Sequence, residues 1–180
     1  MAEPTRMYTT DELLRIPKDG YKYELVKGEL RVSPAGLRHE KIGMKLGRLL
    51  LDFVEEHHLG EVYGSSAGFK LPNGDVRSPD VSFVRAERLP AGQTPEGFAE
   101  FLPDLAVEIV SPSDRVTEIA EKIGEYFANG VELIWLVDPQ RETITVYRSI
   151  TDVMTLHAAD ELRGDPLLAG FSCRVREVFA

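Results

Sequence analysis

Apolar residues recur with a helical period through one long stretch of the chain. Between positions 39 and 57 they return every three or four residues, at Ile42, Leu46, Leu49, Leu50, Phe53 and Val54. Residues with this spacing share one face of an α-helix. Gly60 follows as a typical signal for the end of a helix. The pattern predicts a helix over residues 39–57 with one buried face.

Two shorter elements precede this helix. Thr9 and Glu12 have the spacing of a capping box ahead of an apolar turn, which predicts a short first helix. Residues 21–26 and 29–32 alternate in character around Lys27-Gly28, where the glycine supplies a positive φ. We therefore expect a β-hairpin, and Glu24 lies in its first strand.

Short apolar runs between turn residues fill the rest of the chain. We expect strands over residues 62–65, 68–71, 76–84, 105–110, 132–137 and 143–147. A second helical pattern lies between residues 119 and 127 and ends at Gly130. Residues 89–103 read as a long loop, and the last thirty residues as short strands with a terminal helix. The order of elements predicts an α/β fold with a mixed central sheet flanked by helices.

Length and composition narrow the class of protein. A chain of 180 residues with 43% hydrophobic content is expected to form a single domain over residues 1–180. The net charge of -9 opposes long-range attraction to a polyanion, so nucleic-acid binding would be local. The single Cys173 excludes an internal disulfide framework and a multi-cysteine zinc site. With no signal peptide and no apolar run of about 20 residues, we expect a cytoplasmic protein without membrane association.

Two acidic residues stand in or beside apolar strand-like runs. Asp80 precedes the run from Val81 to Val84, Glu108 interrupts the run over residues 105–110, and Lys122 lies in the helix that follows. A desolvated carboxylate costs several kcal/mol unless a cation pairs with it. A divalent metal ion is one such partner, and it would make the chain a metal-dependent phosphodiesterase.

Structural explanations compete with this hypothesis. Asp80 follows a proline and could end a turn by accepting backbone N–H groups. Lys122 comes four residues after Glu118, so a surface ion pair worth about 0.3–0.5 kcal/mol would also explain it. Glu108 is harder to explain in this way because its neighbours on both sides are apolar.

A row of basic residues borders the apolar face of the long predicted helix. Arg38, Lys41, Lys45 and Arg48 follow one another at spacings of three, four and three. Such a row could contact backbone phosphates, and a solvated helix face explains it as well. His39 at the helix start could carry a proton or lie near a phosphate, or it could be structural.

Four segments, taken in order, resemble a known nuclease family. They are Tyr23-Glu24-Leu25-Val26-Lys27-Gly28-Glu29-Leu30, Arg77-Ser78-Pro79-Asp80-Val81-Ser82, Val107-Glu108-Ile109-Val110-Ser111-Pro112-Ser113 and Trp135-Leu136-Val137-Asp138-Pro139. They resemble the Uma-type restriction endonucleases of the PD-(D/E)XK superfamily, over residues 8–147. The resemblance implies a restriction endonuclease-like fold and a metal-dependent endonuclease that hydrolyses phosphodiester bonds of DNA.

The resemblance also implies roles for individual residues. Asp80, Glu108 and the backbone carbonyl of Ile109 would hold Mg²⁺ or Mn²⁺, which prefer oxygen ligands. The lysine expected two residues after the glutamate is replaced by Val110, and some superfamily members move that lysine to the next helix, where Lys122 stands. The role implied for Lys122 is to stabilise negative charge on the phosphate or to orient the attacking water. Glu24 matches an acidic residue that often completes these sites.

Two other classes of function remain open at this point. A nuclease-like fold that has lost its chemistry could serve as a catalytically inactive binding or regulatory module, which the net negative charge and the displaced lysine favour. Alternatively, residues 143–147 could pair at a sheet edge and make oligomeric assembly the main function. A homodimer or higher homo-oligomer is expected, but it does not by itself distinguish an assembly function from cleavage, because symmetric cleavage of duplex DNA also calls for two active sites.

Overall fold

A six-stranded mixed sheet forms the centre of the computed structural model, which describes residues 6–16, 21–33, 36–89 and 96–180. Its strand order is β10-β9-β8-β7-β6-β3. The strands are β3 (Gly60–Gly64), β6 (Val81–Arg85), β7 (Leu105–Ile109), β8 (Leu133–Asp138), β9 (Thr143–Tyr147) and β10 (Val153–Leu156). Only β7 and β8 are parallel neighbours. This is the mixed central sheet that the sequence predicts.

Two helices cover opposite faces of this sheet. Helix α2 (Leu37–His57) packs on one face, and α3 (Val116–Ala128) packs on the other. Side chains alternate between the faces along a strand, so in β7 Val107 joins the core under α2 while Ala106 joins the core under α3. The same alternation directs Glu108 toward α3.

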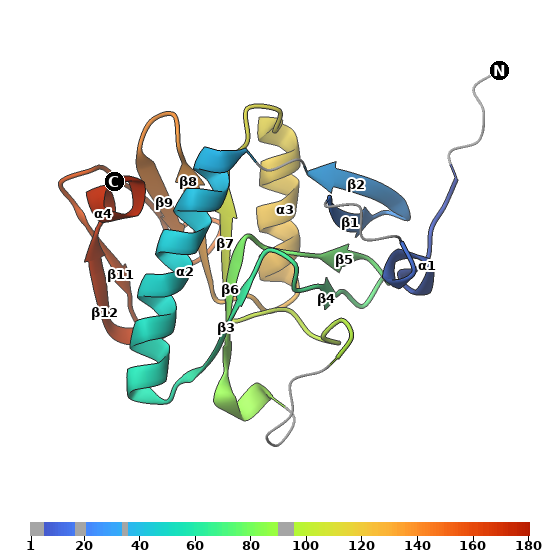
Figure 1. The fold of residues 1–180 in the computed structure, drawn as a ribbon, viewed down its shortest axis with the longest axis horizontal. Helices are drawn as coiled ribbons and strands as arrows, with labels where there is room; N and C mark the ends of the chain where they lie inside the picture. The colour runs from blue at the N-terminus through green and yellow to red at the C-terminus, as the bar shows by residue number, and fades with distance from the viewer. Residues whose placement is uncertain (1–5, 17–20, 34–35, 90–95) are drawn as a thin grey trace.

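A smaller antiparallel sheet lies on the far side of α3 from the central sheet (Figure 1). It contains β2 (Glu29–Ser33), β1 (Lys22–Val26), β5 (Val76–Arg77) and β4 (Phe69–Lys70), in that spatial order. Helix α1 (Thr10–Leu14) packs against it through a small core of Leu13, Leu25 and Val76. The predicted capping box is confirmed, because Thr9 and Glu12 exchange both hydrogen bonds.

The C-terminal part lies beside α2 and shares a core with that helix and the central sheet. It consists of the hairpin β11 (Glu161–Gly164) and β12 (Leu168–Arg174), followed by α4 (Val175–Phe179). Phe171 of β12 stacks on Trp135 of the central sheet with ring centroids 5.6 Å apart. Short strands and a terminal helix are what the sequence predicts here. Among the helices that the structure describes, none is long and apolar enough to span a membrane.

The prediction of one strand over residues 76–84 is wrong. The segment is divided between two sheets, with β5 in the smaller sheet and β6 in the central one. The division falls at Pro79, which has no N–H to continue a ladder. Before this proline the Ser78 backbone N–H donates to the Glu24 carboxylate of the smaller sheet, and after it the Asp80 backbone N–H donates to the Val107 carbonyl of β7 in the central sheet. The break therefore turns Asp80 toward the end of β7.

Two further details differ from the sequence predictions. Helix α2 ends on His58 in the left-handed conformation at φ 54°, and Gly60 already belongs to β3. Gly60 is required for another reason, because a side chain at its φ of 152° would lie 2.0 Å from the Val84 carbonyl oxygen. Strand β9 is an interior strand between β8 and β10, so its proposed role as a free sheet edge is wrong.

The predicted loop over residues 89–103 is seen only in part, because residues 90–95 lie outside the described residues. In its second half, Ala99 pairs with Phe69 beside the smaller sheet through backbone hydrogen bonds.

We expect the thiol of Cys173 to be unreactive in the native protein. Its side chain lies in the core next to β11, and burial together with Glu177 raises its pKa to about 12. Because the thiolate is the reactive form, a disulfide reagent at pH 8 should modify native Cys173 roughly a hundredfold or more slowly than the urea-unfolded chain. Equal rates under both conditions would contradict the buried position.

Candidate active site

An open cleft of about 1060 Å³ lies between the smaller sheet and the layer formed by α3 and the end of β7. Its lining includes all five residues proposed from the sequence for catalysis or metal binding: Glu24, Asp80, Glu108, Ile109 and Lys122. They come from β1, the connection between β5 and β6, β7 and α3. Residues separated by up to 98 positions in the chain thus meet in one cleft.

Asp80 is held at three points. Its Oδ2 accepts a hydrogen bond from the Ile109 backbone N–H at 2.8 Å and lies 3.2 Å from Nε2 of His39. Its Oδ1 accepts from the Lys22 ammonium at 2.7 Å. The side chain is only 6% exposed. Asp80 is therefore an ionised, oriented carboxylate at the end of β7.

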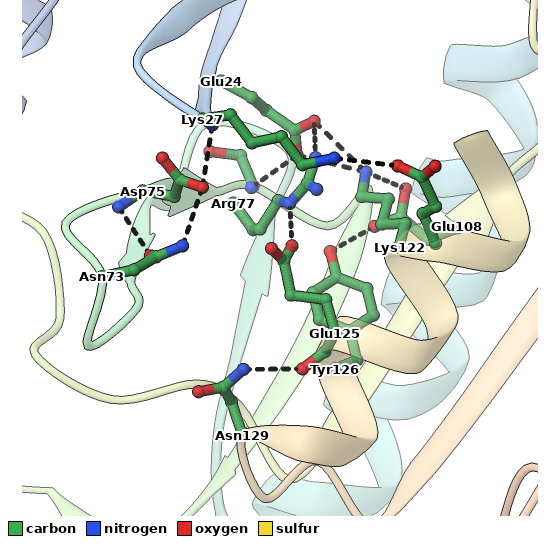
Figure 2. Close-up of polar contacts among 12 residues, drawn as sticks. Glu24, Lys27, Asn73, Asp75, Arg77, Glu108, Lys122, Glu125, Tyr126 and Asn129 are labelled. Atoms are coloured by element: carbon green, nitrogen blue, oxygen red, sulfur yellow. Dashed lines mark hydrogen bonds and ion pairs between the residues drawn. The ribbon is translucent and has the colours of Figure 1, made fainter.

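Glu108 points toward α3 and is held by two side chains of that helix (Figure 2). Lys122 Nζ donates to Oε2 at 2.8 Å, and the Tyr126 hydroxyl donates to Oε1 at 2.5 Å. Residues four apart on a helix share a face, which is why both donors reach the same carboxylate. The surface pair of Lys122 with Glu118 does not form, and Glu118 contacts Arg31 of β2 instead.

Glu24 connects the smaller sheet to the same ammonium group (Figure 2). Its Oε1 lies 3.1 Å from Lys122 Nζ and accepts from the Ser78 backbone N–H at 2.8 Å. Its Oε2 lies 3.6 Å from Nη1 of Arg77, whose Nε donates to Glu125 of α3 at 2.5 Å. Lys122 therefore bridges two buried carboxylates that come from different sheets.

The electrostatics of the cluster follow from burial and from these partners. Burial alone would raise the pKa of Asp80, but the hydrogen bond from His39 and the charge of Lys22 hold that pKa well below its usual range. Burial also opposes the charge of Lys122, yet Glu108 and Glu24 raise its pKa above the usual value. Burial and the nearby Asp80 raise the pKa of Glu108.

The donor atoms at the end of β7 fit a divalent cation. Carboxylate oxygens of Asp80 and Glu108 and the carbonyl of Ile109 are the hard ligands that Mg²⁺ and Mn²⁺ accept. Two ammonium groups, those of Lys22 and Lys122, already bring positive charge to both carboxylates. Within the ranges that the structure describes, no three acidic, histidine or cysteine side chains are grouped to share one ion. A bound ion would take over contacts that the lysines now make.

The basic row on α2 lies outside the cleft lining. Arg38 pairs with Glu142 at 2.9 Å and Arg48 lies 3.5 Å from Asp52, while Lys45 donates to the backbone carbonyl of Ala180. The fourth member of the row, Lys41, is exposed. A role of this row in nucleic-acid binding stays a prediction.

The sequence interpretation missed three residues of the cluster. Lys22 alternates with Glu24 on β1, so the period of a strand already placed both on one face. Tyr126 lies four residues after Lys122, which is the helical spacing for a shared face. Arg77 could not be identified, because its partner Glu125 belongs to an element distant in sequence.

The pairing of His39 with Asp80 predicts a pH dependence in metal-free buffer. The hydrogen bond that His39 donates to the Asp80 carboxylate raises the pKa of His39 above its ordinary value of about 6.5. Because the folded pKa lies above the unfolded one, the stabilisation is complete below about pH 6.5 and is lost as the pH rises through the folded pKa. NMR titration should give a higher pKa for His39 in the wild type than in Asp80→Asn.

Denaturant unfolding provides a second test of the contact between His39 and Asp80. The stability advantage of the wild type over His39→Asn should be larger at pH 5.5 than at pH 8.5. An advantage that grows with rising pH would contradict the assigned contact.

Comparisons with known proteins agree with this architecture. The Uma2 family, described as "Putative restriction endonuclease", matches residues 10–176. A crystal structure described as a "putative nuclease belonging to DUF820" from Anabaena variabilis superposes with a TM-score of 0.81 at 20% identity, over 95% of this chain and 97% of that one. This similarity confirms the predicted fold. A search of the curated proteins finds no match. Because the family match spans nearly the whole chain, the protein belongs to the Uma2 family.

Proposed function

We propose that the protein is a metal-dependent endonuclease that hydrolyses phosphodiester bonds of DNA. Asp80, Glu108 and the carbonyl of Ile109 are the proposed ligands of Mg²⁺ or Mn²⁺, and Lys122 and Glu24 are the proposed catalytic partners. Membership of a family described as "Putative restriction endonuclease" supports a nucleic-acid substrate. The homodimer expected from the sequence stays a prediction, and light scattering at several protein concentrations tests it.

One observation carries the proposal: a buried lysine bridges two buried carboxylates beside a third. The Lys122 ammonium lies 2.8 Å from Glu108 and 3.1 Å from Glu24, and the three side chains are at most 18% exposed. Desolvating these charges costs several kcal/mol each, and packing apolar residues in their place is often as stable. A cluster of this kind in an open cleft supports a functional rather than a structural role.

Each residue of the cluster has its own proposed role in phosphodiester hydrolysis. A bound divalent ion would lower the pKa of its water and draw charge from the scissile phosphate. Lys122 would donate hydrogen bonds to the negative charge that develops on the phosphate. Tyr126 and the Ser78 backbone N–H fix the rotamers of Glu108 and Glu24, so both carboxylates are oriented before substrate arrives.

The experiment is a cleavage assay with chelator-treated protein. Supercoiled plasmid and single-stranded DNA are incubated with Mg²⁺, with Mn²⁺ and with chelator alone. We expect cleavage with a divalent ion, none with chelator, and loss of cleavage in Glu108→Gln. The matched control is Glu100→Gln, which removes a 75% exposed glutamate outside the cleft and should cleave like the wild type. Absence of cleavage by the wild type with either ion, or unchanged cleavage by Glu108→Gln, would contradict the proposal.

A second candidate, a catalytically inactive binding or regulatory module, is favoured by one feature of the same cluster. Asp80 and Glu108 are already paired with Lys22 and Lys122 of the chain itself. Such a module needs no metal ion to balance its charges. Calorimetry separates the two candidates, since the endonuclease should bind Mg²⁺ or Mn²⁺ in a manner that Asp80→Asn abolishes, and the inactive module should not.

A further inference from the structure

His39 reaches from the start of α2 to the end of β7. Its Nε2 lies 3.1 Å from the carbonyl oxygen of Ile109 and 3.2 Å from Oδ2 of Asp80. The side chain is 17% exposed and lines the same cleft. One imidazole nitrogen therefore faces two oxygen atoms, and both belong to residues proposed as metal ligands.

The separations suit three atoms that share one cation. Neighbouring ligands of an octahedral ion, with bonds of about 2.1 Å, stand about 3 Å apart. The two distances from Nε2 are close to that value. A hydrogen bond from Nε2–H to either oxygen also has this length, so the distances alone do not distinguish a ligand from a donor.

The second ring nitrogen provides the distinguishing observation. Nδ1 of His39 is buried and has no hydrogen-bond partner among the residues that the structure describes. The closest acid is Glu40, whose Oε1 lies 3.8 Å away. A buried polar atom left unpaired costs about 1–3 kcal/mol, which a histidine with a purely structural role would be expected to avoid. In metal-bound histidines the second nitrogen donates to a carboxylate, a backbone carbonyl or water, and the carboxylate of Glu40 lies on the Nδ1 side of the ring.

We propose that His39 is a ligand of the metal site, with Nε2 bound to the ion beside Oδ2 of Asp80 and the Ile109 carbonyl oxygen, and with Glu40 accepting from Nδ1–H. Glu108 would join these ligands by exchanging its contact with Lys122 for the ion. The consequence is a change in metal preference. Mg²⁺ strongly prefers oxygen ligands, whereas divalent transition ions accept a mixture of imidazole nitrogen and oxygen. The site is therefore selective for a transition ion such as Mn²⁺ over Mg²⁺. This inference rests on the proposed function, because it adds a ligand to the same site.

The test uses Mn²⁺ as a spectroscopic probe of its own ligands. Pulsed electron paramagnetic resonance of the wild type with one equivalent of Mn²⁺ should show coupling to a directly bound nitrogen. Protein labelled with ¹⁵N only in histidine should show the isotope change in that coupling. The His39→Gln variant keeps a side-chain N–H donor but has no imidazole, so it should lose the coupling and bind Mn²⁺ at least tenfold more weakly. Its Mg²⁺ affinity should change less.

The control is His57→Gln, at the exposed far end of the same helix, which should retain the nitrogen coupling. Circular dichroism establishes that both variants are folded. If the wild type binds Mn²⁺ and Asp80→Asn does not, but no histidine coupling appears or the coupling survives in His39→Gln, the inference is overturned while the proposed metal site stands. If the wild type binds no Mn²⁺, both the inference and the metal site are overturned.

Discussion

Replacing Lys122 with methionine should destabilise the protein by about 3–5 kcal/mol and lower DNA cleavage by about a hundredfold or more. Methionine has nearly the same length as lysine, so the change removes charge rather than volume. It leaves the carboxylates of Glu24 and Glu108 buried without the ammonium group that lies within 3.1 Å of both. The free energy of unfolding is measured by urea denaturation in metal-free buffer, and cleavage is measured at a temperature where the variant is folded.

Two further variants distinguish the loss of the Lys122 bridge between Glu24 and Glu108 from the general effect of removing a positive charge. Lys27→Met removes a lysine from an exposed ion pair with Glu121, 76% and 67% exposed, and should cost less than about 1 kcal/mol. The double variant Lys122→Met/Glu108→Gln removes one of the two stranded charges. Its loss of unfolding free energy should be smaller than the sum of the losses in the two single variants by about 1 kcal/mol or more, and the double variant should remain inactive. If Lys122→Met were as stable as Lys27→Met, the buried bridge would not exist in solution.

The part of the site that could be predicted from the sequence depends on residues that contradict their local pattern. Glu108 interrupts an apolar strand, and its position in a two-residue period fixes the face it occupies once the strand is identified. Lys122 follows from the helical period of its segment and from the resemblance to a known family. In both cases the local period alone determines the direction of the side chain.

The partners of these residues could not be predicted, because they depend on how the two sheets are placed. Lys22 meets Asp80 only because Pro79 sends the chain from the smaller sheet to the central one. Within an apolar segment a single proline is compatible with an edge strand, so the sequence predicted one strand where there are two. The contact of Ser78 with Glu24 could not be predicted for the same reason, because it also depends on where the chain leaves the smaller sheet.

The fold was predicted best where the chain repeats a pattern over many residues. The 21-residue helix α2 was identified from its apolar face, although the helix starts at Leu37 and its end is set by His58 rather than Gly60. Element ends are decided by one or two residues, and non-glycine residues such as His58 occasionally adopt the left-handed conformation. The interior position of β9 depends on β10, whose exposed residues gave only a weak strand pattern.

Asp104 is a buried carboxylate that the sequence analysis did not single out, and it lies where the chain enters β7. Its Oδ1 accepts from Arg88 at 2.9 Å and from Arg85 at 3.3 Å, and its Oδ2 accepts from the Arg85 backbone N–H at 2.8 Å. Its backbone N–H donates to Phe83 of β6, and its carbonyl accepts from Leu133 at the start of β8. Asp104 therefore fixes the register of three central strands at the end opposite Glu108.

Asp104→Ala should consequently lower the free energy of unfolding by about 3 kcal/mol, because it removes three charge-assisted hydrogen bonds and leaves the Arg85 backbone N–H unpaired. The matched control is Glu132→Ala, which removes the other carboxylate bound to Arg85. Glu132 is 48% exposed against 2% for Asp104, so water replaces its contacts and the cost should stay below about 1 kcal/mol. Urea denaturation of both variants measures the difference. Equal losses of unfolding free energy in the two variants would mean that the burial of Asp104 does not determine how much this residue contributes to stability.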